Sequence, residues 1–142
     1  MDATSPDWIL VPLFGHLVLV FILFAVVSLK RLQATNAEDV SIADLAHTGR
    51  EPELSRRWAR NLDNQFQVPL LFYALVALLY ATHSITYLQI ALAWVFLFGR
   101  IVHTVVQTSG DNVTLRGRIF TINFLALAFM WLAFFYSRLA AL

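Results

Sequence analysis

The chain has 142 residues, of which 59% are hydrophobic and 13% are charged, and its formal net charge is +1. This balance is typical of a small integral membrane protein rather than a soluble domain, and a charge so close to neutral argues against a nucleic-acid-binding protein. The absence of cysteine excludes disulfides, thiolate metal sites and a cysteine nucleophile. We expect a single domain over residues 1–142.

The first predicted membrane span covers about residues 8–30. It carries no charged residue until Lys30 and Arg31, and about 20 apolar residues are enough to cross the hydrocarbon core of a bilayer. A polar connection over residues 32–55 follows. Within it, the segment Asn36-Ala-Glu38-Asp39 is expected to form a turn or a helix cap.

Three further spans are predicted, at about residues 58–82, 87–107 and 115–137. The second span contains Pro69, which is expected to kink the helix and to free a backbone carbonyl. The link between the second and third spans is so short that it requires a tight helical hairpin. The expected fold class is therefore all-α, an integral membrane four-helix bundle.

The distribution of basic residues predicts the orientation of these spans. Four spans place both termini on the same side of the membrane. Lysine and arginine gather at the connections after the first and third spans, and positive charge marks cytoplasmic connections. We therefore expect both termini on the non-cytoplasmic side and the two basic connections in the cytoplasm, at the inner membrane if the source is bacterial.

Polar side chains extend from these basic connections into the spans. Two sets of three are spaced to share one helix face each, namely Arg60, Asn64 and Gln67 in the second span and Arg100, His103 and Gln107 in the third. With Arg116 at the start of the fourth span, they lie at one depth near the cytoplasmic face. Polar groups are costly inside a membrane, so their convergence indicates a site.

The residue types in this layer favour a small anionic, peptide-like ligand. Guanidinium groups bind carboxylates in a bidentate manner, and Asn and Gln side chains suit peptide groups and ammonium. A divalent metal site is not predicted, because histidine and carboxylate residues do not occur together at ligand spacing.

The order and spacing of these motifs resemble the MAPEG family, membrane-associated proteins in eicosanoid and glutathione metabolism. Arg60-x-x-x-Asn64-x-x-Gln67 is similar to the family's R-x-x-x-N-x-x-E signature. Arg100-x-x-His103-Thr-Val, followed by Arg116, resembles the third- and fourth-helix motif of the microsomal prostaglandin E synthase branch. Asn36-x-Glu38-Asp39 is similar to the N-P-E-D loop of that branch. The resemblance covers nearly the whole chain.

The resemblance implies a homotrimer of four-helix subunits with glutathione bound as cosubstrate between neighbouring subunits. It implies a glutathione transferase or peroxidase that acts on a lipophilic substrate from the surrounding lipid, through a thiolate held by an arginine. We take Arg116 and Asp39 as candidate catalytic residues. The candidate glutathione-binding residues are Lys30, Arg57, Arg60, Asn64, Gln67, Arg100, His103 and Gln107.

Four positions depart from the family pattern. Gln67 stands where the family usually has Glu, Gln107 where Tyr is common, and Gly117 and Phe120 where the prostaglandin branch has Ser and Tyr. These departures argue against prostaglandin isomerisation and leave conjugation or peroxide reduction. Two other functions stay open. One is a catalytically silent membrane scaffold whose arginines hold lipid phosphates. The other is a small transporter, which the lack of acids within the apolar spans disfavours.

Overall fold

The computed structural model describes residues 6–37, 41, 43, 47, 49, 51–110 and 112–140. Its elements are η1 (Pro6–Ile9), α1 (Leu10–Ala37), α3 (Glu53–Asp63), η2 (Asn64–Phe66), α4 (Val68–Ala81), α5 (Tyr87–Ser109) and α6 (Val113–Leu139). The described residues contain no strand. Four helical segments are long and apolar enough to cross a membrane: Pro6–Thr35, Glu53–Ala81, Tyr87–Ser109 and Val113–Leu139. The predicted all-α, four-span fold is confirmed.

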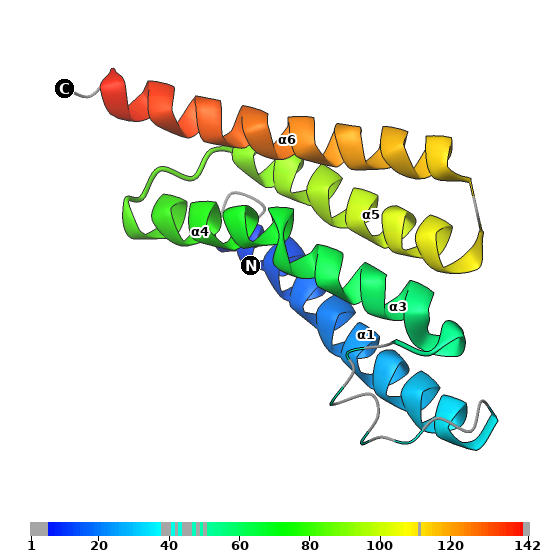
Figure 1. Cartoon of the computed structure of the whole chain (residues 1–142). Helices are drawn as coiled ribbons and strands as arrows, with labels where there is room; N and C mark the ends of the chain where they lie inside the picture. Colours follow the sequence, from blue (N-terminus) through cyan, green and yellow to red (C-terminus); the bar gives the residue numbers. More distant parts are fainter. Residues whose placement is uncertain are drawn as a thin grey trace.

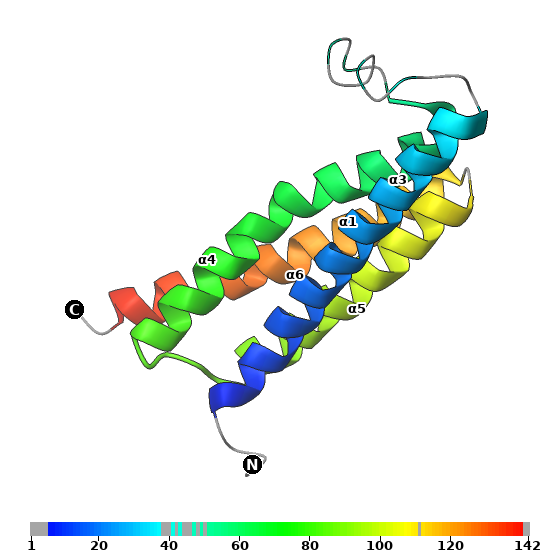
Figure 2. The ribbon, with the colours of Figure 1, turned by 90° about the horizontal axis from the view of Figure 1, so that it is seen from below.

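The helices alternate in direction along the bundle. α5 and α6 lie side by side, and α1 packs along α3 (Figure 1). α1 also contacts α5, and α4 contacts α6. The start of α1 and the end of α6 lie at one end of the bundle, whereas the end of α1, the start of α3 and the start of α6 lie at the other (Figure 2).

The outer surface of the bundle is apolar along the spans. Phe21 of α1, Phe98 of α5 and Phe129 of α6 expose 69%, 58% and 61% of their surface. Soluble monomers rarely expose apolar patches over such lengths. This surface is therefore suited to contact lipid, as expected of an integral membrane protein.

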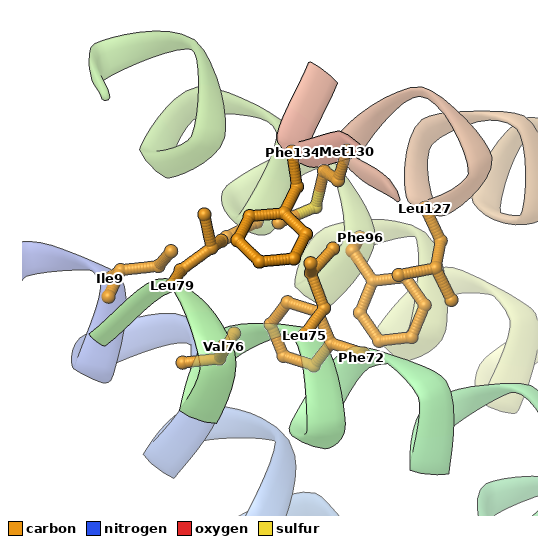
Figure 3. Packing of buried hydrophobic residues seen from close by; sticks show 10 residues of the cluster. Ile9, Phe72, Leu75, Val76, Leu79, Phe96, Leu127, Met130 and Phe134 are labelled. Carbon is orange, nitrogen blue, oxygen red and sulfur yellow. The ribbon is translucent and has the colours of Figure 1, made fainter. Parts of the chain in front are cut away.

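A hydrophobic core joins α4, α5 and α6 toward the end of the bundle where α1 begins. Phe72 and Leu79 of α4, Phe96 of α5 and Met130 of α6 are fully buried in it (Figure 3). The rings of Phe72 and Phe96 are stacked, with centroids 4.4 Å apart. This packing fixes the second and third spans against each other. The polar residues of these two spans, which lie next to the core along the bundle, therefore keep their relative positions.

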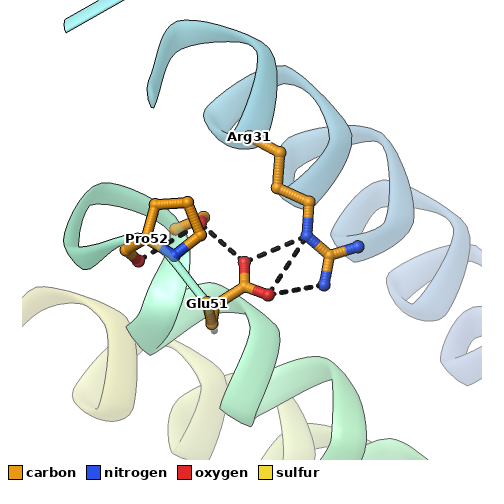
Figure 4. Close-up of polar contacts among 4 residues, drawn as sticks. Arg31, Glu51 and Pro52 are labelled. Carbon is orange, nitrogen blue, oxygen red and sulfur yellow. Dashed lines mark hydrogen bonds and ion pairs between the residues drawn. The ribbon is translucent and has the colours of Figure 1, made fainter. Parts of the chain in front are cut away.

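At the other end of the bundle, α3 is held against α1 by apolar and charged contacts. Leu62 of α3 packs in a buried cluster with Leu23 of α1. Arg31 donates to the Glu51 carboxylate, with Nε 3.0 Å from Oε1 and Nη2 2.7 Å from Oε2 (Figure 4). The Ser55 hydroxyl donates to the same carboxylate at 2.6 Å. The bond from Arg31 holds the pKa of the Glu51 carboxyl below its usual value.

The first and second spans differ from the sequence-based expectation, and the second span also begins at Glu53 rather than near residue 58. α1 continues to Ala37 instead of ending near Lys30, because residues 31–37 contain neither glycine nor proline to end the helix. The second span is more than kinked. α3 ends at Asp63, a 3-10 turn follows, and Gln67 leaves the helical conformation with φ −101° and ψ −99°. Pro69 causes this break, because it lacks an N–H group and its ring crowds the preceding turn.

Candidate functional site

The break in the second span is held by a buried arginine from the third. Arg100 of α5 is fully buried, and its Nη2 donates to the carbonyl oxygen of Asn64 at 2.9 Å. A backbone carbonyl at the break thus accepts a hydrogen bond from Arg100. The backbone of η2 is thereby fixed against α5. The carbonyl that Pro69 itself leaves without a helical donor is that of Gln65, four residues earlier.

Gln65 is the centre of a buried hydrogen-bond network. Its Oε1 accepts from Nε and Nη2 of Arg100 at 3.1 and 2.8 Å and contacts Nε2 of His16 at 3.1 Å. Its Nε2 donates to Oδ1 of Asn61 at 3.2 Å and to Oγ1 of Thr104 at 3.4 Å. The network therefore joins α1, the break of the second span, and α5 within the bundle.

Arg100 carries a buried positive charge that no acid of the described residues neutralises. Its hydrogen-bond partners are an amide oxygen and a backbone carbonyl, and its Nη1 has no partner in the described part of the chain. Charges are rarely buried without compensation. The guanidinium therefore gives the neighbouring space a positive potential that favours an anion.

A cavity of about 500 Å³ lies between the second, third and fourth spans, at the end of the bundle where α6 begins. Its walls come from α3 and η2, from the last turns of α5 and from the first turns of α6. The described residues that line it are Arg60, Asp63, Asn64, Gln67, His103, Gln107, Val113, Arg116, Gly117 and Phe120.

Two amide groups of this cavity are held by hydrogen bonds, whereas its imidazole forms none within the described part of the chain. Oε1 of Gln107 accepts from Nδ2 of Asn61 at 2.9 Å and from Nδ2 of Asn64 at 3.0 Å. His103 is only 3% exposed, its Nδ1 has no partner among the described residues, and its ring centroid lies 6.2 Å from that of Phe120. An unsatisfied imidazole nitrogen beside a cavity is a candidate ligand contact.

The charged groups of the cavity are not paired with one another. Arg60 and Asp63 are exposed and lie one turn apart, and Arg116 is half-buried. In the described part of the chain, none of the three forms an ion pair or a side-chain hydrogen bond. The cavity therefore presents two guanidinium groups and one carboxylate that are available to a ligand.

The structure gathers six of the predicted site residues at this cavity, namely Arg60, Asn64, Gln67, His103, Gln107 and Arg116. Arg100 is not among the lining residues, because its side chain is turned toward Gln65. Lys30 and Arg57 also lie outside the lining. Asp39 lies outside the described residues, so its role stays a prediction.

The sequence-based reasoning overlooked the residues that support the cavity. Asn61 and Gln65 are four residues apart in the second span, and Arg100 and Thr104 are four apart in the third. Residues four apart share a helix face. The spacing therefore contained a signal for two facing polar pairs. Asp63, which is not among the predicted site residues, also lines the cavity.

A family model described as the MAPEG family matches residues 9–136. The matched range includes all the residues that line the cavity. No curated protein and no solved structure matches the chain significantly.

Proposed function

Because the chain belongs to the MAPEG family, we propose that it is a glutathione-dependent membrane enzyme. It acts as a transferase or a peroxidase on lipophilic electrophiles or hydroperoxides. The observation that carries this proposal is the cavity between the second, third and fourth spans. There, Arg60 and Arg116, which form no ion pair within the described residues, lie with the hydrogen-bonded amides of Asn64 and Gln107 and with His103, whose Nδ1 has no partner in the same part of the chain.

The cavity suits a small anionic peptide. Arg60 offers a guanidinium to a ligand carboxylate, which it can bind in a bidentate manner. Asn64, held by Gln107, and Gln67 suit the peptide groups of the ligand. The buried charge of Arg100 adds positive potential behind these groups. We assign Lys30 and Arg57 a supporting electrostatic role from outside the lining.

Arg116 is the proposed thiolate-stabilising residue. A guanidinium remains charged at any relevant pH, and a nearby positive charge favours the ionised form of a thiol. In conjugation, the glutathione sulfur then forms the bond to the electrophilic carbon, and the leaving group departs with its electron pair. The protein needs to move no proton in that step once the thiolate is bound.

The lipophilic substrate has an apolar wall beside Arg116. Val113 and Phe120 are exposed along the same cavity. At Gly117, a Cβ atom would meet nothing within 4 Å. Open space and apolar side chains one turn from Arg116 suit an electrophile that enters from the lipid.

We propose that the enzyme is a homotrimer, with the cavity of each subunit completed by a neighbour. The polar walls of the cavity would cost free energy if they faced lipid, so a neighbouring subunit is expected to cover them. The number three rests on the family relationship. Mass measurement of the detergent-solubilised complex tests it, and a stable monomer would contradict it.

Thermal stabilisation of the purified protein by reduced glutathione tests the function. Ligand at a hundredfold excess over its Kd stabilises the folded state by about 2.7 kcal/mol. Arg60→Ala should remove most of this stabilisation. Arg118→Ala, an exposed arginine of α6 outside the lining, should retain it.

A silent lipid-binding scaffold gives a different pattern in this assay. It is stabilised by anionic phospholipid and not by glutathione. The absence of a glutathione effect in wild type would therefore contradict the proposed function. Stabilisation without turnover of any electrophile or hydroperoxide would contradict the enzymatic part of it.

A further inference from the structure

Asp63 is the one acidic residue among the described residues that line the cavity. It is the last residue of α3, so its side chain lies at the start of the break in the second span. Its carboxylate is exposed and has neither an ion pair nor a hydrogen bond within the described residues, although Arg60 is only one turn away. Arg31 interacts with the Asp63 carboxylate electrostatically, without a close ion pair. An exposed acid that forms no ion pair within the described residues is available to a cationic group.

The charges around the cavity are complementary to those of glutathione. The ligand carries two carboxylates, one ammonium group and a thiol that can ionise. Arg60 and Arg116 match its negative groups. Gln67 lines the same cavity but is neutral, so it can accept a hydrogen bond from an ammonium group and cannot form an ion pair with it.

We propose that Asp63 binds the free amino group of glutathione and makes this enzyme selective for ligands that carry it. This inference rests on the proposed function. Asp63 and Gln67 lie on either side of the break in the second span and both line the cavity, so the carboxylate and the amide can approach the same ligand group. The negative charge that Gln67 lacks is supplied by Asp63.

A structural role for Asp63 is the competing explanation. Asp63 and Arg60 also line a second cavity of about 350 Å³, together with Arg31 and Arg56. In that position the carboxylate can offset the positive charge of the arginines without any ligand. Such a role predicts a lower melting temperature of the ligand-free Asp63→Asn variant and an equal loss of affinity for every ligand.

The test compares calorimetric titrations of reduced glutathione and of N-acetylglutathione, in which the amino group is capped and uncharged. Wild type should bind glutathione more tightly. Asp63→Asn should weaken glutathione binding roughly ten- to a hundredfold, the effect of one charge-assisted hydrogen bond, and should leave N-acetylglutathione binding unchanged. The substitution keeps the size of the side chain, and the melting temperature without ligand reports on folding.

A second variant separates the loss of selectivity from a folding defect, because only a folded protein can regain the selectivity. Gln67→Glu in the Asp63→Asn background restores a carboxylate on the other side of the break, so it should recover much of the preference for the free amino group. If wild type binds neither ligand, the proposed function fails. If wild type binds both equally, or if Asp63→Asn keeps the preference or weakens both ligands alike, the role of Asp63 is refuted while the proposed function stands.

Discussion

Oε1 of Gln65 accepts two hydrogen bonds from Arg100, at 3.1 Å from Nε and 2.8 Å from Nη2. Gln65 lies in the break of the second span, and Arg100 lies in the middle of the third. The pair therefore fixes the two walls of the cavity relative to each other. It also shields a buried charge, so its loss should affect both stability and ligand binding.

Gln65→Leu should lower the free energy of unfolding by at least roughly 1.5–3 kcal/mol, the value of a hydrogen bond to a charged group. The larger part of this loss comes from leaving the Arg100 guanidinium buried without its acceptor. Gln67→Leu is the matched control, because Gln67 is exposed and outside the network. Thermal unfolding in detergent measures both variants, and equal melting temperatures would refute the structural role of Gln65.

Gly99→Ala and Gly117→Ala form a second matched pair. A Cβ atom at Gly99 would lie 1.8 Å from Oδ1 of Asn123, whereas at Gly117 it would meet nothing within 4 Å. Asn123 is 1% exposed, so it cannot move aside easily. Gly99→Ala should destabilise the protein by about 1–3 kcal/mol, and Gly117→Ala should stabilise it slightly, because alanine favours a helix. The reverse order of melting temperatures would contradict the packing of α5 on α6.

The bond between Arg31 and Glu51 predicts a small pH dependence of stability. Its contribution is complete above the unfolded-state pKa of Glu, about 4.3. The contribution disappears as the pH falls through the lower folded-state pKa. Glu51→Gln should therefore lower the free energy of unfolding at neutral pH by less than about 1 kcal/mol, because the pair is partly exposed. The accompanying decrease in melting temperature should shrink below about pH 4. Arg31→Gln in the same background should add little further loss. A difference independent of pH would argue against the bond.

The topology predicted from the basic connections can be tested by cysteine labelling, since the chain contains no cysteine of its own. Ser109→Cys at the end of α5 and Ala140→Cys after α6 are both at exposed positions. In intact cells, a membrane-impermeant reagent should label the cysteine at position 140 and not that at position 109. Labelling of both from one side would show that the spans do not alternate as proposed.

The four spans follow from the sequence because a bilayer imposes length and apolarity on every crossing helix. The position of Pro69 likewise predicted that the second span is disturbed. The sequence did not predict how many residues the break includes, because that depends on Arg100, which binds the Asn64 carbonyl from another helix. Spacing placed Arg100 and His103 on one face of α5. It could not tell that His103 reaches the cavity while Arg100 turns to Gln65.

Arg116 is proposed to hold the thiolate of bound glutathione, and the ultraviolet absorbance of that thiolate as a function of pH measures this role. With glutathione bound, wild type should show thiolate at neutral pH, well below the pKa of about 8.5 of an ordinary cysteine thiol. Arg116→Ala should move this titration to higher pH, and conjugation of an electrophile such as a chloronitrobenzene should slow at neutral pH and partly recover in alkali. Arg118 lies roughly 200° around the helix from Arg116. In the Arg118→Ala variant, the thiolate of bound glutathione should therefore titrate as it does in wild type. A wild-type titration like that of free glutathione, or a larger effect of Arg118→Ala, would contradict the account.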